Sequence, residues 1–250
     1  MGLDSFLDGL DNDLAWRKKE ISELQMLCKS NVNEILLKSL LLMLYAHWEG
    51  FIKNSSKQYL AYVSGLRIDI GALTLNYKTI SMKGIIAQCY ETRDKPSLHN
   101  ELDFVERFIE KDNAKFQLGS NLSKEKDKSI IDTRDNLSSE VFFNLCKVVG
   151  FSEKSCIRTK KRLLDEHFLN NRNAISHGSK LEGLDSDEFN LDHESVFKLK
   201  DLIFKIMSSY QDDLKEYAQS QLYLREKTDI KKSYDLKSDL SLKNELDTSS

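Results

Sequence analysis

The residues of this sequence best suited to chemistry lie in one short stretch, LNNRNAISHG, at positions 169–178. Arg172 and His177 are five residues apart, which on a helix is about 7.5 Å along the axis and roughly 140° around it. Arginine offers a planar fork of donors for phosphate oxygens, and histidine can exchange a proton near neutral pH. Gly178 follows directly and predicts that the helix ends there, with His177 in its last turn. These residues could cleave a phosphodiester without a metal ion.

The same spacing occurs a second time, between Arg162 and His167 in RLLDEH. Spacing alone therefore says little. Two features favour the later copy: a polar residue, Asn173, follows its arginine, and a glycine follows its histidine. A structural interpretation of the later copy also stays open, in which His177 caps the helix and Arg172 is an ordinary surface residue.

The later copy resembles the Arg-Asn-x-x-x-His motif of the HEPN superfamily, the all-helical domains found in many prokaryotic RNase toxins and phage-defence proteins. Three further segments, in the expected order, resemble standalone HEPN proteins of that type: WRKKEISEL (16–24), LYAHWEGFIK (44–53) and NLSSEVFFNLCKVVGF (136–151). Together they cover most of residues 10–210. The resemblance implies a helical bundle of HEPN type.

For function, the resemblance implies a metal-independent endoribonuclease of toxin or phage-defence type that works as a homodimer, with two motif helices at one cleft. His177 would move a proton, Arg172 would stabilise charge on the phosphorane, Asn173 would orient a phosphate or its helix partner, and Glu49 would position Arg172. A cognate antitoxin or defence-system partner would be a further partner. The alternative is a non-catalytic HEPN module that binds RNA, a nucleotide or a partner protein as an antitoxin, sensor or scaffold.

Apolar periodicity independently predicts the helices that must position these residues. It favours helices over 3–29, 35–63, 136–149 and 193–223, with the motif helix starting near residue 158. A single Pro and ten Gly leave few turn residues for a many-stranded sheet. The sequence therefore predicts an all-α, up-and-down helical bundle.

Two regions fit this bundle less well. Residues 65–135 are predicted to form an insertion or irregular region. Apolar residues alternate weakly over 66–77, which indicates a short hairpin or an extended insertion, and short helices are predicted over 80–90 and 98–109. Residues 226–250 are charged and Ser-rich with isolated aliphatics, so we expect a disordered tail after a domain of residues 1–225.

Two groups of charged residues are candidates for the site. Glu49 lies on a largely apolar helix, where a carboxylate costs free energy unless it is paired, so it either faces Arg172 or lies at an exposed edge. The densest basic cluster comprises Arg158, Lys160, Lys161 and Arg162. Because it leads into the motif, it could track an RNA backbone, although a solvated helix face is an equal alternative.

Composition limits the remaining possibilities. The formal net charge is −3, so any nucleic-acid site must be a local patch. The cysteines lie far apart, with no CxxC and no close histidine, which predicts free thiols and neither metal nor other cofactor: Cys28, Cys89, Cys146 and Cys156. The acidic N-terminus does not resemble a signal peptide, and the longest apolar run, 35–48, is too short to cross a bilayer. We expect a cytoplasmic protein without membrane contact.

Overall fold

The computed structural model of the protein describes residues 1–31, 33–91, 98–119, 127–178 and 192–248. Within these residues the regular structure is helical, and extended pairing is limited to two isolated bridges. The α-helices are α1 (Leu3–Ser30), α2 (Glu34–Gly65), α3 (Leu75–Ser81), α4 (Lys83–Glu91), α5 (His99–Glu110), α6 (Ser139–Val149), α7 (Ser155–Arg158), α8 (Asn170–Ser176), α9 (His193–Gln219) and α10 (Thr228–Asp247). The predicted all-α fold class is confirmed.

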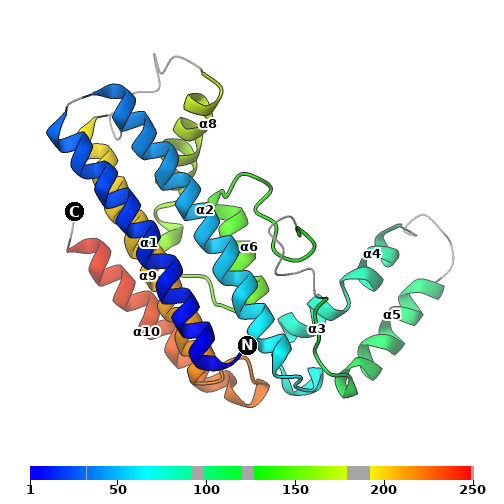
Figure 1. Ribbon diagram of the computed structural model, residues 1–250. Coiled ribbons are helices and arrows are strands. Elements are labelled where there is room, and N and C mark those ends of the chain that lie inside the picture. The colour runs from blue at the N-terminus through cyan, green and yellow to red at the C-terminus, as the bar shows by residue number, and fades with distance from the viewer. Residues whose placement is uncertain (32, 92–97, 120–126, 179–191, 249–250) are drawn as a thin grey trace.

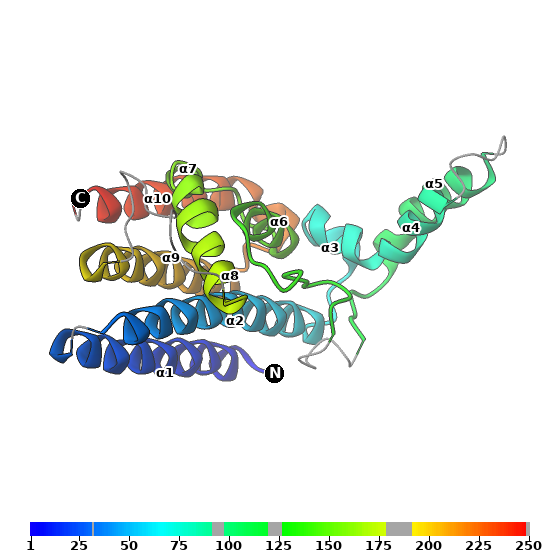
Figure 2. The same cartoon turned by 90° about the horizontal axis from the view of Figure 1, so that it is seen from above.

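The core forms around α2, which packs against α1 and α9, with α10 on the far side of α9 (Figures 1 and 2). Asn33 caps α2, its side chain accepting a hydrogen bond from the Ile35 N–H at 2.8 Å. Leu40, Leu44 and Phe51 of α2 are fully buried. By length and apolarity α2 would also suit a membrane span, but the packing of α1 and α9 against it explains the same apolarity as that of a core helix.

The segment that carries the motif crosses the long helices (Figure 2) and is not one regular α-helix. A π-helical segment, Leu163–Leu169, separates α7 from α8, whereas the sequence predicted a single helix from residue 158. Asp165 in this segment accepts hydrogen bonds from the N–H and the hydroxyl of Ser139, at 2.7 and 2.6 Å. A carboxylate is well placed there, because Ser139 begins α6 and its free N–H groups carry partial positive charge. The wide turn is thereby fixed to α6.

Residues 66–77 do not form a hairpin, so the hairpin alternative is wrong. Ile70–Ala72 form a 3₁₀ turn instead, and the two bridges join Asp69 to Lys115 and Leu73 to Leu224. The alternating apolar pattern has a different cause: Ile70 and Leu73 are buried against remote parts of the chain. Beyond this turn, α4 and α5 form an arm that projects from the bundle (Figure 2).

The disordered tail predicted for residues 226–250 is also wrong, because residues Thr228–Asp247 form α10, which packs against α9 and α7. Leu242 and Leu246 are buried. The polar composition of this segment suggested disorder, but its polar residues make specific contacts. Asp239 accepts hydrogen bonds from the N–H groups of Ser155 and Cys156, both at 3.1 Å. Through Asp239, α10 caps the N-terminus of α7 and so supports the motif segment.

Truncation after Lys227 should therefore destabilise the protein substantially. It removes Leu242 and Leu246, whose burial is worth about 1.5–3 kcal/mol each, together with the cap on α7. Thermal melts followed by circular dichroism measure the loss, and an unchanged melting temperature would contradict the docking of α10.

Asp239→Asn tests the cap alone and should cost about 0.5–2 kcal/mol, as lost helix caps do. Burial opposes ionisation of Asp239, but the hydrogen bonds from Ser155 and Cys156 outweigh it and hold its pKa below the usual value. Because the folded-state pKa is the lower one, this stabilisation is present above the unfolded-state pKa and is lost as the pH falls through the folded-state pKa. The exposed Asp247→Asn is the matched control, with little expected effect.

Candidate functional site

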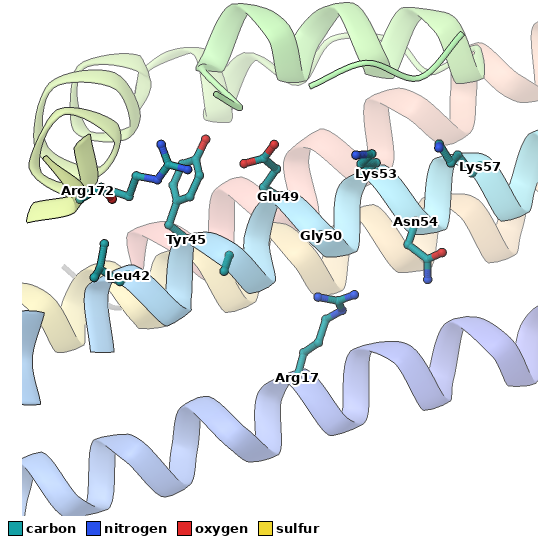
Figure 3. A pocket seen from close by; sticks show the side chains of 11 residues that line it. Arg17, Leu42, Tyr45, Glu49, Gly50, Lys53, Asn54, Lys57 and Arg172 are labelled. Carbon is teal, nitrogen blue, oxygen red and sulfur yellow. The ribbon is translucent and has the colours of Figure 1, made fainter. Parts of the chain in front are cut away.

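A cavity of about 650 Å³ lies between α1, α2 and α8. Its lining residues are Arg17, Leu42, Tyr45, Ala46, Glu49, Gly50, Lys53, Asn54, Lys57, Arg172 and Ser176. Those from α2 recur at three- and four-residue steps from Leu42 to Lys57, so they form one stripe about 22 Å long. Figure 3 shows them in a row along the helix, with Arg172 at one end and Arg17 approaching from α1.

Arg172 is held at the cavity by contacts from three parts of the chain. Its Nη1 donates to Oδ1 of Asn136 at 3.0 Å and to Oδ1 of Asn173 at 2.7 Å. Its guanidinium carbon lies 4.4 Å from the centroid of the Tyr45 ring, a cation–π contact. Among the described residues nothing accepts from Nε or Nη2, so these donors remain for a bound anion. Asn173 thus orients the arginine itself.

Glu49 lines the same cavity but forms no ion pair with Arg172, contrary to the direct pairing that the sequence suggested. Its carboxylate accepts a hydrogen bond from the buried Thr133 hydroxyl at 2.5 Å. Tyr45 lies between Glu49 and Arg172 in Figure 3. Burial raises the pKa of Tyr45, the Glu49 charge raises it further, and the Leu137 N–H and Arg172 act in the opposite direction. Glu49 can therefore act on Arg172 only through Tyr45 or across the cavity.

On the α1 side, a buried carboxylate organises the wall of the cavity. Asp13 accepts hydrogen bonds from Arg17 Nε at 2.8 Å, from Trp16 Nε1 at 3.0 Å and from Asn54 Nδ2 at 2.8 Å. The Arg17 guanidinium also lies 4.6 Å from the Trp16 ring centroid. Asp13 thus joins α1 to α2 and fixes Arg17 over the cavity.

His47 stands beside Arg17 and is not a candidate for proton transfer. It is buried, its Nε2 lies 3.0 Å from Glu20, and its ring meets the edge of Trp16 at 5.0 Å between centroids. Burial lowers the pKa of His47, the charge of Arg17 lowers it further, and Glu20 acts in the opposite direction. His47 is therefore a structural residue of the interface between α1 and α2.

Two lysines of α2 add positive charge to the cavity. Lys57 is buried, and its ammonium donates to the backbone carbonyl of Asp127 at 2.6 Å. Lys53 is half-buried and forms no hydrogen bond or ion pair with any residue that the structure describes. With Arg17 and Arg172, four cations face one lining carboxylate, Glu49. In a protein with a formal net charge of −3, this is a local basic site.

His177 is exposed at the end of α8 and does not line the cavity. Its backbone N–H donates to the Asn173 carbonyl at 3.0 Å, and Gly178 follows with φ +68°. The predicted end of the helix is confirmed. Within one chain, however, the cavity contains Arg172 and Ser176 without His177.

The second copy of the motif cannot serve as a matched pair. His167 is buried in the π-helical segment, whereas Arg162 lies on the surface 2.9 Å from Glu166. An anion reaching Arg162 would not reach His167. The structure thus distinguishes the two Arg-His pairs, which have the same spacing in the sequence.

None of the four residues of the basic cluster lines the cavity on α2. Arg158 pairs with Glu153 and Arg162 with Glu166, which compensates two of the four charges. Lys160 borders a different hollow, and Lys161 is exposed. Their contact with RNA stays a prediction.

Arg17, Lys53 and Lys57 also line the cavity, although they were not predicted to be site residues. A signal was present: in a helix whose core face is apolar, charged residues recur at 49, 53 and 57, four residues apart. Such a stripe indicates one polar side on an otherwise buried helix. Among the described residues, no three His, Cys, Asp or Glu side chains are gathered to hold a metal ion.

The fold is thus an all-α bundle in which Asn173 supports Arg172 in α8 and the exposed His177 follows that helix. The chain belongs to the HEPN family, since the model described as HEPN_MAE_28990-like HEPN matches residues 6–223. No curated protein and no solved structure gave a significant match.

Gly50 provides a test of how tightly the cavity wall is built. A Cβ at this position would lie 2.7 Å from Arg17 Nη1, so Gly50→Ala must displace the guanidinium. Alanine is favoured over glycine in a helix by about 1 kcal/mol. We expect no gain in the free energy of unfolding, because the shift disturbs the contacts of Arg17 with Asp13, together with a change in Trp16 fluorescence.

Gly84→Ala is the matched control, because a Cβ at Gly84 in α4 meets nothing within 4 Å. It should leave the protein equally or more stable without changing tryptophan fluorescence. A stabilised Gly50→Ala protein with unchanged fluorescence would show that Arg17 is not confined by α2.

Proposed function

We propose that this protein is a metal-independent endoribonuclease of toxin or phage-defence type, which acts in the cytoplasm as a homodimer. The observation that best supports the proposal is the way in which the Arg172 guanidinium is held. Its guanidinium is oriented by Asn136, Asn173 and Tyr45, yet keeps donors directed to a cavity with three further cations. Family membership supports the same reading.

The cavity suits a phosphodiester backbone better than a small neutral ligand. The stripe on α2 is about 22 Å long, and it is open and positively charged. Arginine stacked on an aromatic ring can bind phosphate through two parallel hydrogen bonds. Lys53 stands two helical turns from Tyr45, so a strand bound at Arg172 would pass it next.

Cleavage needs one group that accepts a proton and one that donates a proton, and a single chain offers only His177 at the motif. In the proposed reaction, the ribose 2′-oxygen attacks phosphorus and the bond from phosphorus to the 5′-oxygen breaks. His177 takes the proton from the 2′-hydroxyl, and His177 of the partner subunit gives one to the 5′-oxygen. The products are a 2′,3′-cyclic phosphate and a 5′-hydroxyl. Arg172 stabilises the charge on the phosphorane.

A second candidate is a non-catalytic HEPN module that binds RNA or a partner protein. The exposure of His177, outside the cavity of its own chain, favours it. The two candidates differ in whether the site needs a second chain. The nuclease requires one to bring a histidine to Arg172, and the binding module does not. A cognate antitoxin or defence-system partner fits either.

The central prediction concerns the two motif histidines. His177→Ala should abolish cleavage of a generic RNA with little loss of stability, because the side chain is exposed. His167→Ala should lower the melting temperature, because His167 is buried, while leaving residual cleavage. Arg172→Lys should also abolish cleavage, since an ammonium group cannot form two parallel hydrogen bonds to one phosphate.

The assay is gel analysis of RNA cut by purified variants with and without EDTA, with melts alongside. We expect cleavage to continue in EDTA and to leave cyclic phosphate ends. An active, well-folded His177→Ala protein would remove the nuclease assignment from this site. Products with 3′-hydroxyl ends would overturn the mechanism.

A separate prediction tests whether RNA binds in the cavity along α2. In a His177→Ala background, which should bind RNA without cutting it, Lys53→Ala should weaken binding of a single-stranded RNA. If Lys53 meets a phosphate, the slope of log affinity against log salt should fall by about 1. Fluorescence anisotropy across a salt series measures both.

Two lysines serve as comparisons. Lys232→Ala, on α10, should change neither affinity nor slope beyond its small effect on net charge. Lys161→Ala tests the basic cluster: a larger effect there than at Lys53 would move the RNA path from the α2 stripe to that cluster.

A further inference from the structure

The α5 helix of the projecting arm, together with Leu98 directly before it, exposes a continuous apolar stripe. Leu98, Leu102, Val105 and Ile109 are 69%, 60%, 50% and 66% exposed, and no residue of α5 is buried. Their steps of four, three and four residues form the seam that helices bury against one another in coiled coils. Isolated exposed aliphatics are ordinary, but a contiguous stripe of this kind marks an interaction surface.

The stripe is exposed because another side of α5, about 90–130° around the helix from the stripe, holds the helix in place. Phe104 and Phe108 pack together there, with ring centroids 6.0 Å apart. Lys78 of α3 lies 3.7 Å from the Phe108 centroid and donates to Asp112 at 2.6 Å. Because these contacts fix the rotation of α5, the arm cannot turn the aliphatic stripe inward without losing them.

Acidic residues flank the stripe on both sides. At 100° per residue, Glu101 and Glu106 lie roughly 70° to either side of its centre. Neither forms an ion pair with any described residue, whereas Asp103 and Arg107 neutralise each other at 2.8 Å. These are the flanking positions that set partner choice and orientation when two helices pair.

We propose that the α5 stripe binds an amphipathic helix of a partner protein that carries Lys or Arg beside its apolar seam. A second copy of this chain fits poorly. In a parallel pairing of two α5 helices, Glu101 would face Glu106 of the partner subunit, and like charges at these positions repel. The charge pattern thus selects a basic partner and opposes the pairing of two α5 helices. The α5 stripe lies on the arm, away from the cavity on α2.

The test uses the full chain and two designed helical peptides. Both have Leu and Ile at the seam; one carries Lys and the other Glu at the flanking positions. Anisotropy of the labelled peptides should show tighter binding of the Lys peptide by at least about tenfold, one 1.4 kcal/mol step, with the difference decreasing as salt is added. Equal binding of both peptides, or no binding of the Lys peptide, would overturn the proposal.

Matched variants separate the seam from the charges. Leu102→Asp with Val105→Asp should abolish binding without lowering the melting temperature of the bundle, since neither residue is buried. Glu101→Lys with Glu106→Lys should reverse the preference toward the Glu peptide. Sedimentation of the wild-type chain and the Asp variant supplies a last check: self-association lost only in the variant would show that a second copy occupies the stripe, and would sink the proposal.

Discussion

The single polar stripe on α2 is the constraint on which the rest of the structure depends. Most of this helix must be apolar, because α1 and α9 bury it, and a charge on those sides would remain unpaired. Its charged residues therefore fall on the one side left open, and each is accommodated differently. Thr133 donates to Glu49, the Asp127 carbonyl accepts from Lys57, and Lys53 faces the cavity. The cavity exists because the neighbouring helices leave this stripe of α2 uncovered.

The position of Arg172 follows from the same arrangement. Its guanidinium rests on Tyr45, whose hydroxyl accepts from the Leu137 N–H at 2.5 Å and is thereby tied to the start of α6. The π-helical segment before it is fixed to α6 through Asp165. Wide helical turns of this type occur often at functional sites, where they redirect a side chain. The arginine is thus oriented by packing between elements and not by its own helix alone.

The sequence could predict the long helices, because an apolar period of 3.6 residues over 27 or more residues leaves little ambiguity. It also predicted the helix end at Gly178, since glycine there adopts φ +68°. It could not predict α10, whose support comes from pairs such as Asp239 with Ser155 that are distant in sequence. Glu49 lines the cavity, but its partner Thr133 could not be predicted, because it lies in an irregular segment without a periodic signal.

The cap that Asp239 places on α7 has a consequence for the order of events during synthesis. Asp239 lies 84 residues after Ser155, so a growing chain exposes the motif segment well before the helix that completes its support. Until then the amide groups at the start of α7 have only water as a partner. The growing chain therefore passes through a stage in which α7 has been synthesised but the carboxylate that caps its N-terminus has not.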